Sequence, residues 1–197
     1  MKARYAVLLV MLAAFAAVLS QKAIAGKGGI PFPAGQFSTT SQGSFAACVN
    51  PTTFALESCS TSGVLVFPTS DLQNGMTTFD ASGHGCATFT EIQSDLPPDA
   101  FPPFVTNEHS VSKLLNYDSM TGTGNGSFTG YTGGACLGAT FDSTGATEVS
   151  RGTVHFVVTD DDGKRIDFLV TNLTNSTGSI GTFSLSGTDL RQTRPQS

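Results

Sequence analysis

Short apolar runs with a period of two fill this chain after residue 35, and they constrain its fold more than any other feature. The clearest example spans residues 152–172, where two alternating rows flank an Asp- and Gly-rich turn at 160–164. The rows are Val154, Phe156 and Val158, then Ile166, Phe168 and Val170. A period of two is that of a β-strand, and Asp and Gly tolerate tight turns. We therefore expect a β-hairpin whose two apolar rows face one core.

Similar runs recur along the chain, cut by Gly, Asn or Asp at the spacing typical of a barrel or sandwich. No long segment has a helical period. We expect strands at 63–67, 76–79, 86–92, 111–117, 127–131, 136–141 and 181–190, with one or two more between 36 and 56. Short connections favour antiparallel neighbours, and closure removes exposed edges. The sequence predicts an all-β fold, a single antiparallel barrel of about 8–10 short strands; a β-sandwich is the alternative.

Two glycine-spaced runs carry a resemblance. Residues 122–128 and 181–187 resemble strands of bacterial secreted proteins with an allene-oxide-cyclase or dirigent type of barrel. The resemblance covers only the last third of the chain and rests on residues of low complexity. It implies a barrel, and no functional residue is carried over from it.

The first 25 residues predict a secretory signal peptide. Lys2 and Arg4 flank the start of an apolar run, and small residues at positions 23 and 25 suit a signal peptidase. After cleavage near Gly26 we expect a flexible Gly- and Pro-rich lead-in at 26–35. One all-β domain should follow at 36–191, with a polar tail at 192–197. This organisation predicts a secreted or periplasmic protein.

The four cysteines predict a fold stapled by two disulfides. Their number is even, and a secreted chain meets an oxidising compartment. Four cysteines allow three pairings, and the spacing favours Cys48 with Cys59 and Cys86 with Cys136. A metal site is the weaker alternative, because the chain has no C-x-x-C pair.

Charge and hydropathy exclude two classes of partner. The net charge is −5, and loss of the leader's three cations lowers it to −8. The remaining cations are scattered, whereas nucleic-acid binding needs a basic face. No apolar run after the leader approaches the roughly 20 residues of a membrane-spanning helix. An outer-membrane barrel is a further alternative, and the four cysteines and the polar tail argue against it.

Motifs for nucleophilic and metal chemistry are missing. No G-x-S-x-G elbow occurs. His84 is two residues from Cys86, but that cysteine is needed for a disulfide. His84, His109 and His155 lack metal-binding spacing, and His155 should point outward from its strand. The Asp-rich turn at 160–163 lacks the calcium-loop spacing. We expect no metal site and no cofactor.

Paired carboxylates among Asp80, Glu91, Asp95 and Asp99 are conceivable for glycoside chemistry. The chain has no tryptophan, which removes a large flat surface for stacking a sugar. We therefore expect no glycosidase activity.

The segment 93–109 contains four prolines and should be a long surface loop. Its Phe101 and Phe104 would line the mouth of the barrel with Tyr117 and Tyr131, or simply cover one end of the core. The leading hypothesis is a non-enzymatic barrel that binds a small apolar ligand. One alternative is a structural or surface interaction protein. The other is a barrel-type cyclase or isomerase in which a group such as Glu91 acts on the substrate. The sequence leaves the oligomeric state open.

Overall fold

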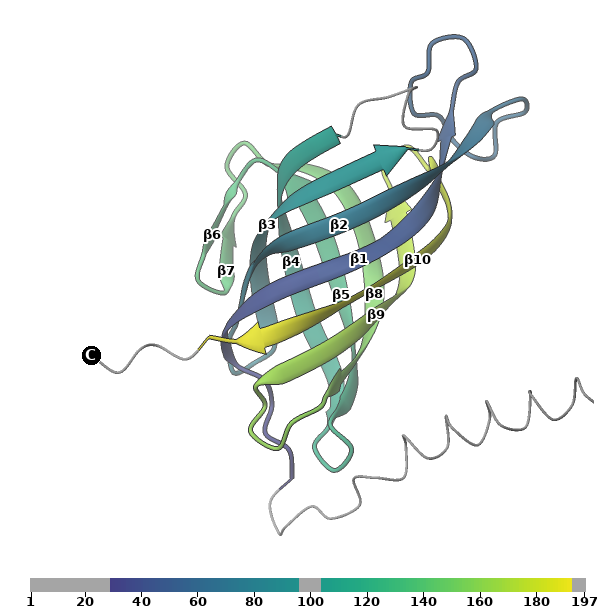
Figure 1. The fold of residues 1–197 in the computed structure, drawn as a ribbon. Coiled ribbons are helices and arrows are strands. Elements are labelled where there is room, and N and C mark those ends of the chain that lie inside the picture. The colour runs from purple at the N-terminus through teal and green to yellow at the C-terminus, as the bar shows by residue number, and fades with distance from the viewer. Residues whose placement is uncertain (1–28, 96–103, 193–197) are drawn as a thin grey trace, which may run out of the picture.

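The computed structural model describes residues 29–95 and 104–192, which form a closed antiparallel barrel of eight strands (Figure 1). Around the barrel the order is β1-β10-β9-β8-β5-β4-β3-β2. The barrel strands are β1 (Gly35–Val49), β2 (Leu65–Phe79), β3 (His84–Asp95), β4 (Phe104–Asp118), β5 (Thr123–Thr132), β8 (Thr147–Val158), β9 (Arg165–Asn175) and β10 (Ile180–Arg191). The predicted antiparallel barrel is confirmed, and the described residues contain no helix.

The hairpin predicted at 152–172 is formed by β8 and β9. Val154 pairs with Val170, Phe156 with Phe168 and Val158 with Ile166, so the two rows share one face as expected. The last strand, β10, lies between β9 and β1 and closes the barrel. His155 points outward and is exposed.

Two predictions of strands and one prediction of a loop differ from the structure. The runs at 63–67 and 76–79 belong to one continuous strand, β2. The run at 136–141 forms a small hairpin, β6 (Ala135–Leu137) with β7 (Thr140–Asp142), outside the barrel beside β3 (Figure 1). The expected loop at 93–109 is strand at both ends, because β3 continues to Asp95 and β4 begins at Phe104. Only its central part lies outside the described residues.

Inward glycines and phenylalanines are paired across neighbouring strands. Five such pairs are Gly75 with Phe89, Gly85 with Phe79, Gly124 with Phe156, Gly152 with Phe128, and Gly187 with Phe168. In each, a Cβ added to the glycine would collide with the phenylalanine. Because glycine leaves room on the pleated surface, the aromatic ring can lie over the neighbouring strand. The many glycines therefore serve the interior of the barrel as well as its turns.

One end of the barrel, here named the plugged end, is filled by side chains and by residues 29–34. The core there consists of buried residues from five strands: Phe37, Phe79, Leu114, Phe156, Val158 and Ile166. Ile30 and Phe32 pack against it, and the Ile30 amide donates to the Ser119 carbonyl at 2.8 Å. The described part of the expected flexible lead-in is therefore packed against the barrel. Gly and Pro prevent regular structure there, but the apolar Ile30 and Phe32 still bury their side chains.

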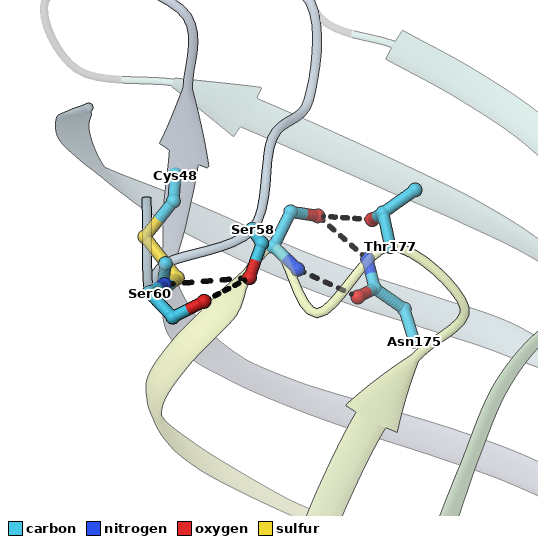
Figure 2. The surroundings of a disulfide bond; sticks show 7 residues. Cys48, Ser58, Ser60, Asn175 and Thr177 are labelled. Carbon is cyan, nitrogen blue, oxygen red and sulfur yellow. Dashed lines mark hydrogen bonds between the residues drawn. A yellow bond between two sulfur atoms is a disulfide. The ribbon is translucent and has the colours of Figure 1, made fainter. Parts of the chain in front are cut away.

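Two disulfides join the predicted partners, Cys48 with Cys59 and Cys86 with Cys136. The first closes the β1–β2 connection (Figure 2), which lies at the end of the barrel opposite the plug (Figure 1). There the Cys59 amide donates to the Gly178 carbonyl at 3.0 Å, which ties this connection to the β9–β10 turn. The second holds the β6–β7 hairpin against β3. None of the described residues forms a helix that could span a membrane.

Candidate functional site

Above the plugged end, several inward side chains of the barrel keep accessible surface. Phe89, Phe128 and Val154 point inward, on the same face of their strands as the core residues. All three remain half-buried. At the plugged end, by contrast, Phe37 and Phe156 are 0% and 1% exposed. An eight-stranded barrel has an interior just wide enough to be filled or to hold one small ligand. The accessible inward surface identifies this upper interior as the candidate site.

Two chemically different walls enclose this space. The inward rows of β5, β8 and β9 present glycines and apolar side chains, including Phe128, Val154 and Phe168. The inward rows of β1 to β4 are instead polar over their central part. Their polar members are Thr39, Ser41, Thr69, Asp71, Gln73, Thr77, Glu91, Gln93, Thr106 and Glu108. The site thus combines an apolar surface with hydrogen-bonding groups, as ligand pockets usually do.

Three carboxyl groups lie in a diagonal row across β2, β3 and β4. Asp71 pairs with Gln93, whose Nε2 donates to Glu91 Oε1 at 2.5 Å. Glu91 lies two residues before Gln93 on the same inward face, and Glu108 lies two residues after Thr106, the β4 partner of Glu91. Diagonal cross-strand neighbours are close enough for long side chains to touch. We name Asp71, Glu91 and Glu108 the acidic row.

Burial changes the protonation of two members of the acidic row, Asp71 and Glu108. Asp71 is 4% exposed, and desolvation together with a hydrogen bond and repulsion from Glu91 raises its pKa to about 8. Desolvation and repulsion from Glu91 likewise raise the pKa of Glu108 to about 8. Both groups are therefore predominantly protonated at neutral pH. A hydrogen bond between two carboxyl groups requires that one of them carries a proton.

One oxygen of the acidic row has no hydrogen-bond partner in the part of the chain that the structure describes. Among the described residues, Asp71 Oδ1 is buried and accepts no hydrogen bond. A buried acceptor without a donor is costly, and native structures contain few of them. A donor supplied by a bound molecule would remove this cost.

A second polar group lies closer to the plugged end. Thr39 Oγ1 lies 2.5 Å from Thr77 Oγ1 and donates a hydrogen bond to Asp189 Oδ1. Burial raises the pKa of Asp189 to about 6, although the bond from Thr39 opposes this shift. Between this group and the acidic row, Ser41 Oγ donates to Gln73 Oε1 at 2.9 Å. Polar side chains thus continue along the inner wall from β10 to β4.

The histidines lie outside the barrel. His84 is the first residue of β3 and lies beside Asp80, with 3.6 Å between its Nδ1 and the carboxylate. His109 contacts Thr88 and the Cys136 sulfur on the outer face, and His155 bonds Asn125. Within the described residues, no three His, Cys, Asp or Glu side chains are placed to hold a metal ion together.

The structure does not bring the predicted ligand-binding aromatics together. Tyr117 lies at the plugged end, where its hydroxyl donates to the Ile30 carbonyl at 2.9 Å and its ring packs on Phe32. Tyr131 lies on the outer face, stacked on Phe141 of the β6–β7 hairpin at 4.8 Å. Neither tyrosine therefore lines the upper interior. Phe101 and the side chain of Phe104 lie outside the described residues.

Of the carboxylates singled out in the sequence, only Glu91 is found in the acidic row. Asp80 is exposed in a turn, while Asp99 and the side chain of Asp95 lie outside the described part. Asp71 and Glu108 were missed because both lie in stretches predicted as connections rather than strands. Residues 67–73 show no alternation of polar and apolar side chains that could have revealed the first of them.

Two shallow depressions occur on the outer surface over β1 and its neighbours, with volumes of about 470 and 530 Å³. Hydroxyl and amide side chains and Leu72 line both. The carboxylate of Asp167, in the first, is bound by Arg165 at 3.0 Å. Fewer ionisable groups come together in these depressions than in the acidic row.

Comparison with protein families, curated proteins and solved structures finds no match for this chain. The class of the protein is thus defined by its own architecture, an eight-stranded antiparallel barrel with a plugged end, two disulfides and an acidic row inside.

Proposed function

We propose that this protein is a secreted or periplasmic barrel that binds one small, largely apolar molecule in its upper interior. The observation that carries this proposal is the half-burial of Phe89, Phe128 and Val154, which face inward yet keep accessible surface. The apolar wall supplies burial for the ligand, and the polar wall orients its polar end. The two disulfides suit an oxidising compartment.

The test is binding of the neutral fluorescent dye N-phenyl-1-naphthylamine to the mature protein. The chain has no tryptophan, so the dye's emission is easily separated from that of the protein. We expect saturable binding of one dye per chain. Val154→Phe would fill the interior and weaken binding at least tenfold, whereas His155→Phe, its exposed neighbour on β8, would leave binding within twofold. Dye binding that is absent, or equal in both variants, contradicts the proposal; circular dichroism checks that each variant is folded.

A second function, that of a barrel-type cyclase or isomerase, is favoured by the acidic row. Carboxyl groups with pKa values near neutrality can both donate and accept protons, as general acid–base catalysis requires. In this case Glu91, Asp71 and Glu108 would exchange protons with a bound substrate. Chemical conversion of a ligand recovered with the protein, lost in Glu91→Gln, would distinguish catalysis from binding alone.

A further inference from the structure

The acidic row has no positive partner among the described side chains. Lys113, Arg151 and Arg165 lie on outward rows of the barrel, and Lys164 pairs with Asp162 in the β8–β9 turn. Arg191 lies at the plugged end, where it donates to the Ala34 carbonyl and stacks on Phe37. These positively charged side chains are thus separated from the acidic row, although buried carboxylates are usually paired with a cation.

The groups that face the acidic row from neighbouring strands are neutral or acidic. The described inward rows of β1, β5, β8 and β9 carry no titratable side chain, and that of β10 carries Asp189 and, at the plugged end, Arg191. Phe89 pairs directly with Glu108 and lies beside Glu91 on the same face. An aromatic face next to carboxyl groups is a common environment for an organic cation.

Building on the proposed function, we infer that the ligand is an apolar amine whose ammonium group is held by Asp71, Glu91 and Glu108. The ammonium would donate to Asp71 Oδ1, the buried oxygen that has no donor among the described residues. Its positive charge would balance the acidic row, and its apolar body would lie against the wall that contains Phe128 and Val154. An anionic ligand would be repelled by the same carboxyl groups.

Binding of a cation should be coupled to proton release. The pKa values of Asp71 and Glu108 near 8 mean that both carry protons at neutral pH, and a nearby ammonium favours their ionised forms. The affinity for an amine should therefore increase from pH 5.5 to pH 8, a range in which the amine itself stays charged. A neutral ligand of the same shape should show little dependence on pH.

The experiment compares three probes with one aromatic body: 1-naphthylmethylamine, 1-naphthylmethanol and 1-naphthoate. Isothermal titration in two buffers of different ionisation enthalpy gives both the affinity and the number of protons released. We expect the amine to bind at least tenfold more tightly than the alcohol, with naphthoate weakest, and to release protons. Asp71→Asn combined with Glu108→Gln should weaken amine binding at least tenfold more than it weakens alcohol binding. Asp161→Asn, an exposed carboxylate in the β8–β9 turn, is the matched control and should change neither.

The outcomes separate the two proposals. If the neutral dye binds but the amine binds no better than the alcohol, or is insensitive to the double substitution, the inference of an amine is overturned and the binding barrel stands. If the neutral dye also fails to bind, the binding function itself is overturned, and the inference fails with it.

Discussion

Thr39 is the residue that supplies a hydrogen bond to the buried Asp189. Its hydroxyl lies between β2 and β10, in contact with Thr77 on one side and with the carboxylate on the other. Asp189 is 5% exposed, so water cannot replace a lost donor without opening the barrel. A buried carboxylate without its donor bears the full cost of desolvation.

Thr39→Val should therefore destabilise the protein by about 1–3 kcal/mol at pH 8, where Asp189 is ionised. The loss should be smaller at pH 4.5, because a protonated Asp189 needs the donor less. Thr40→Val, on the exposed face of the same strand, should change the free energy of unfolding by less than about 0.5 kcal/mol. Denaturant unfolding at the two pH values measures both variants. Equal losses for the two threonines would show that the hydroxyl of Thr39 contributes nothing specific.

At the scale of the strands, glycine determines how the interior is filled. Gly152 on β8 faces Phe128 on β5, and an added Cβ would lie 2.6 Å from the Cζ atom of that ring and would also collide with the Asn172 carbonyl. Backbone cannot move aside as a flexible side chain can. Each of the five glycines paired with a phenylalanine therefore sets where that ring lies.

Gly152→Ala should lower the free energy of unfolding by about 1–3 kcal/mol, the usual cost of overpacking. Gly181→Ala is the matched control, because its Cβ would meet nothing closer than the Ala46 Cβ at 3.4 Å. We expect this second variant to stay within about 0.5 kcal/mol of the parent. Chemical denaturation of both variants is the measurement, and an unaffected Gly152→Ala would refute the packing role given to the glycine.

The same glycines explain which elements could be predicted from the sequence. The hairpin of β8 and β9 was predicted with its correct faces because two apolar rows flank an obvious turn. β2 was predicted only at its ends, because Pro68, Asn74 and Gly75 indicate a turn when they are considered locally. In the barrel Gly75 leaves room for Phe89, and Pro68 lies beyond the last β2–β3 pair. The role of Gly75 depends on the neighbouring strand β3, and the local sequence pattern cannot show which strand is the neighbour.

The acidic row was missed for a related reason. Four prolines between 97 and 103 made the whole of 93–109 resemble a loop, so Glu108 was not placed on a strand. Asp71 fell between the two predicted pieces of β2. Glu91 alone lay within a predicted strand, and it alone was considered as an acting group. The three carboxyl groups come together only when β2, β3 and β4 pair in the correct register. The closed barrel fixes that register.

For the molecule as a whole, the buried carboxyl groups determine how stability depends on pH. The pKa values of Asp71 and Glu108 are raised to about 8 and that of Asp189 to about 6. In the unfolded chain these groups titrate near pH 4. Between pH 4 and pH 8 the folded state thus holds protons that the unfolded state has released. Stability must therefore fall as the pH rises through this range.

The acid side of the profile has the opposite sign. Hydrogen bonds to exposed carboxylates such as Asp118 and Asp142 lower their pKa values, so their stabilising effect is lost only as the pH falls below about 4. The two trends together place the maximum of stability near pH 4–5. This is below the range in which most proteins are most stable.

Thermal unfolding followed by circular dichroism from pH 4 to pH 9 tests this profile. We expect the melting temperature to fall between pH 5 and pH 8, with a loss of stability above about 1.4 kcal/mol, the equivalent of one pKa unit. The triple variant Asp71→Asn, Glu108→Gln, Asp189→Asn should flatten this slope, whereas Asp161→Asn should keep it. A parent protein that is more stable at pH 8 than at pH 5 would contradict the burial of ionisable groups. Because a bound ammonium would favour the ionised row, a saturating amine should restore stability at pH 8 more than at pH 5, which ties the stability of the barrel to the occupant of its interior.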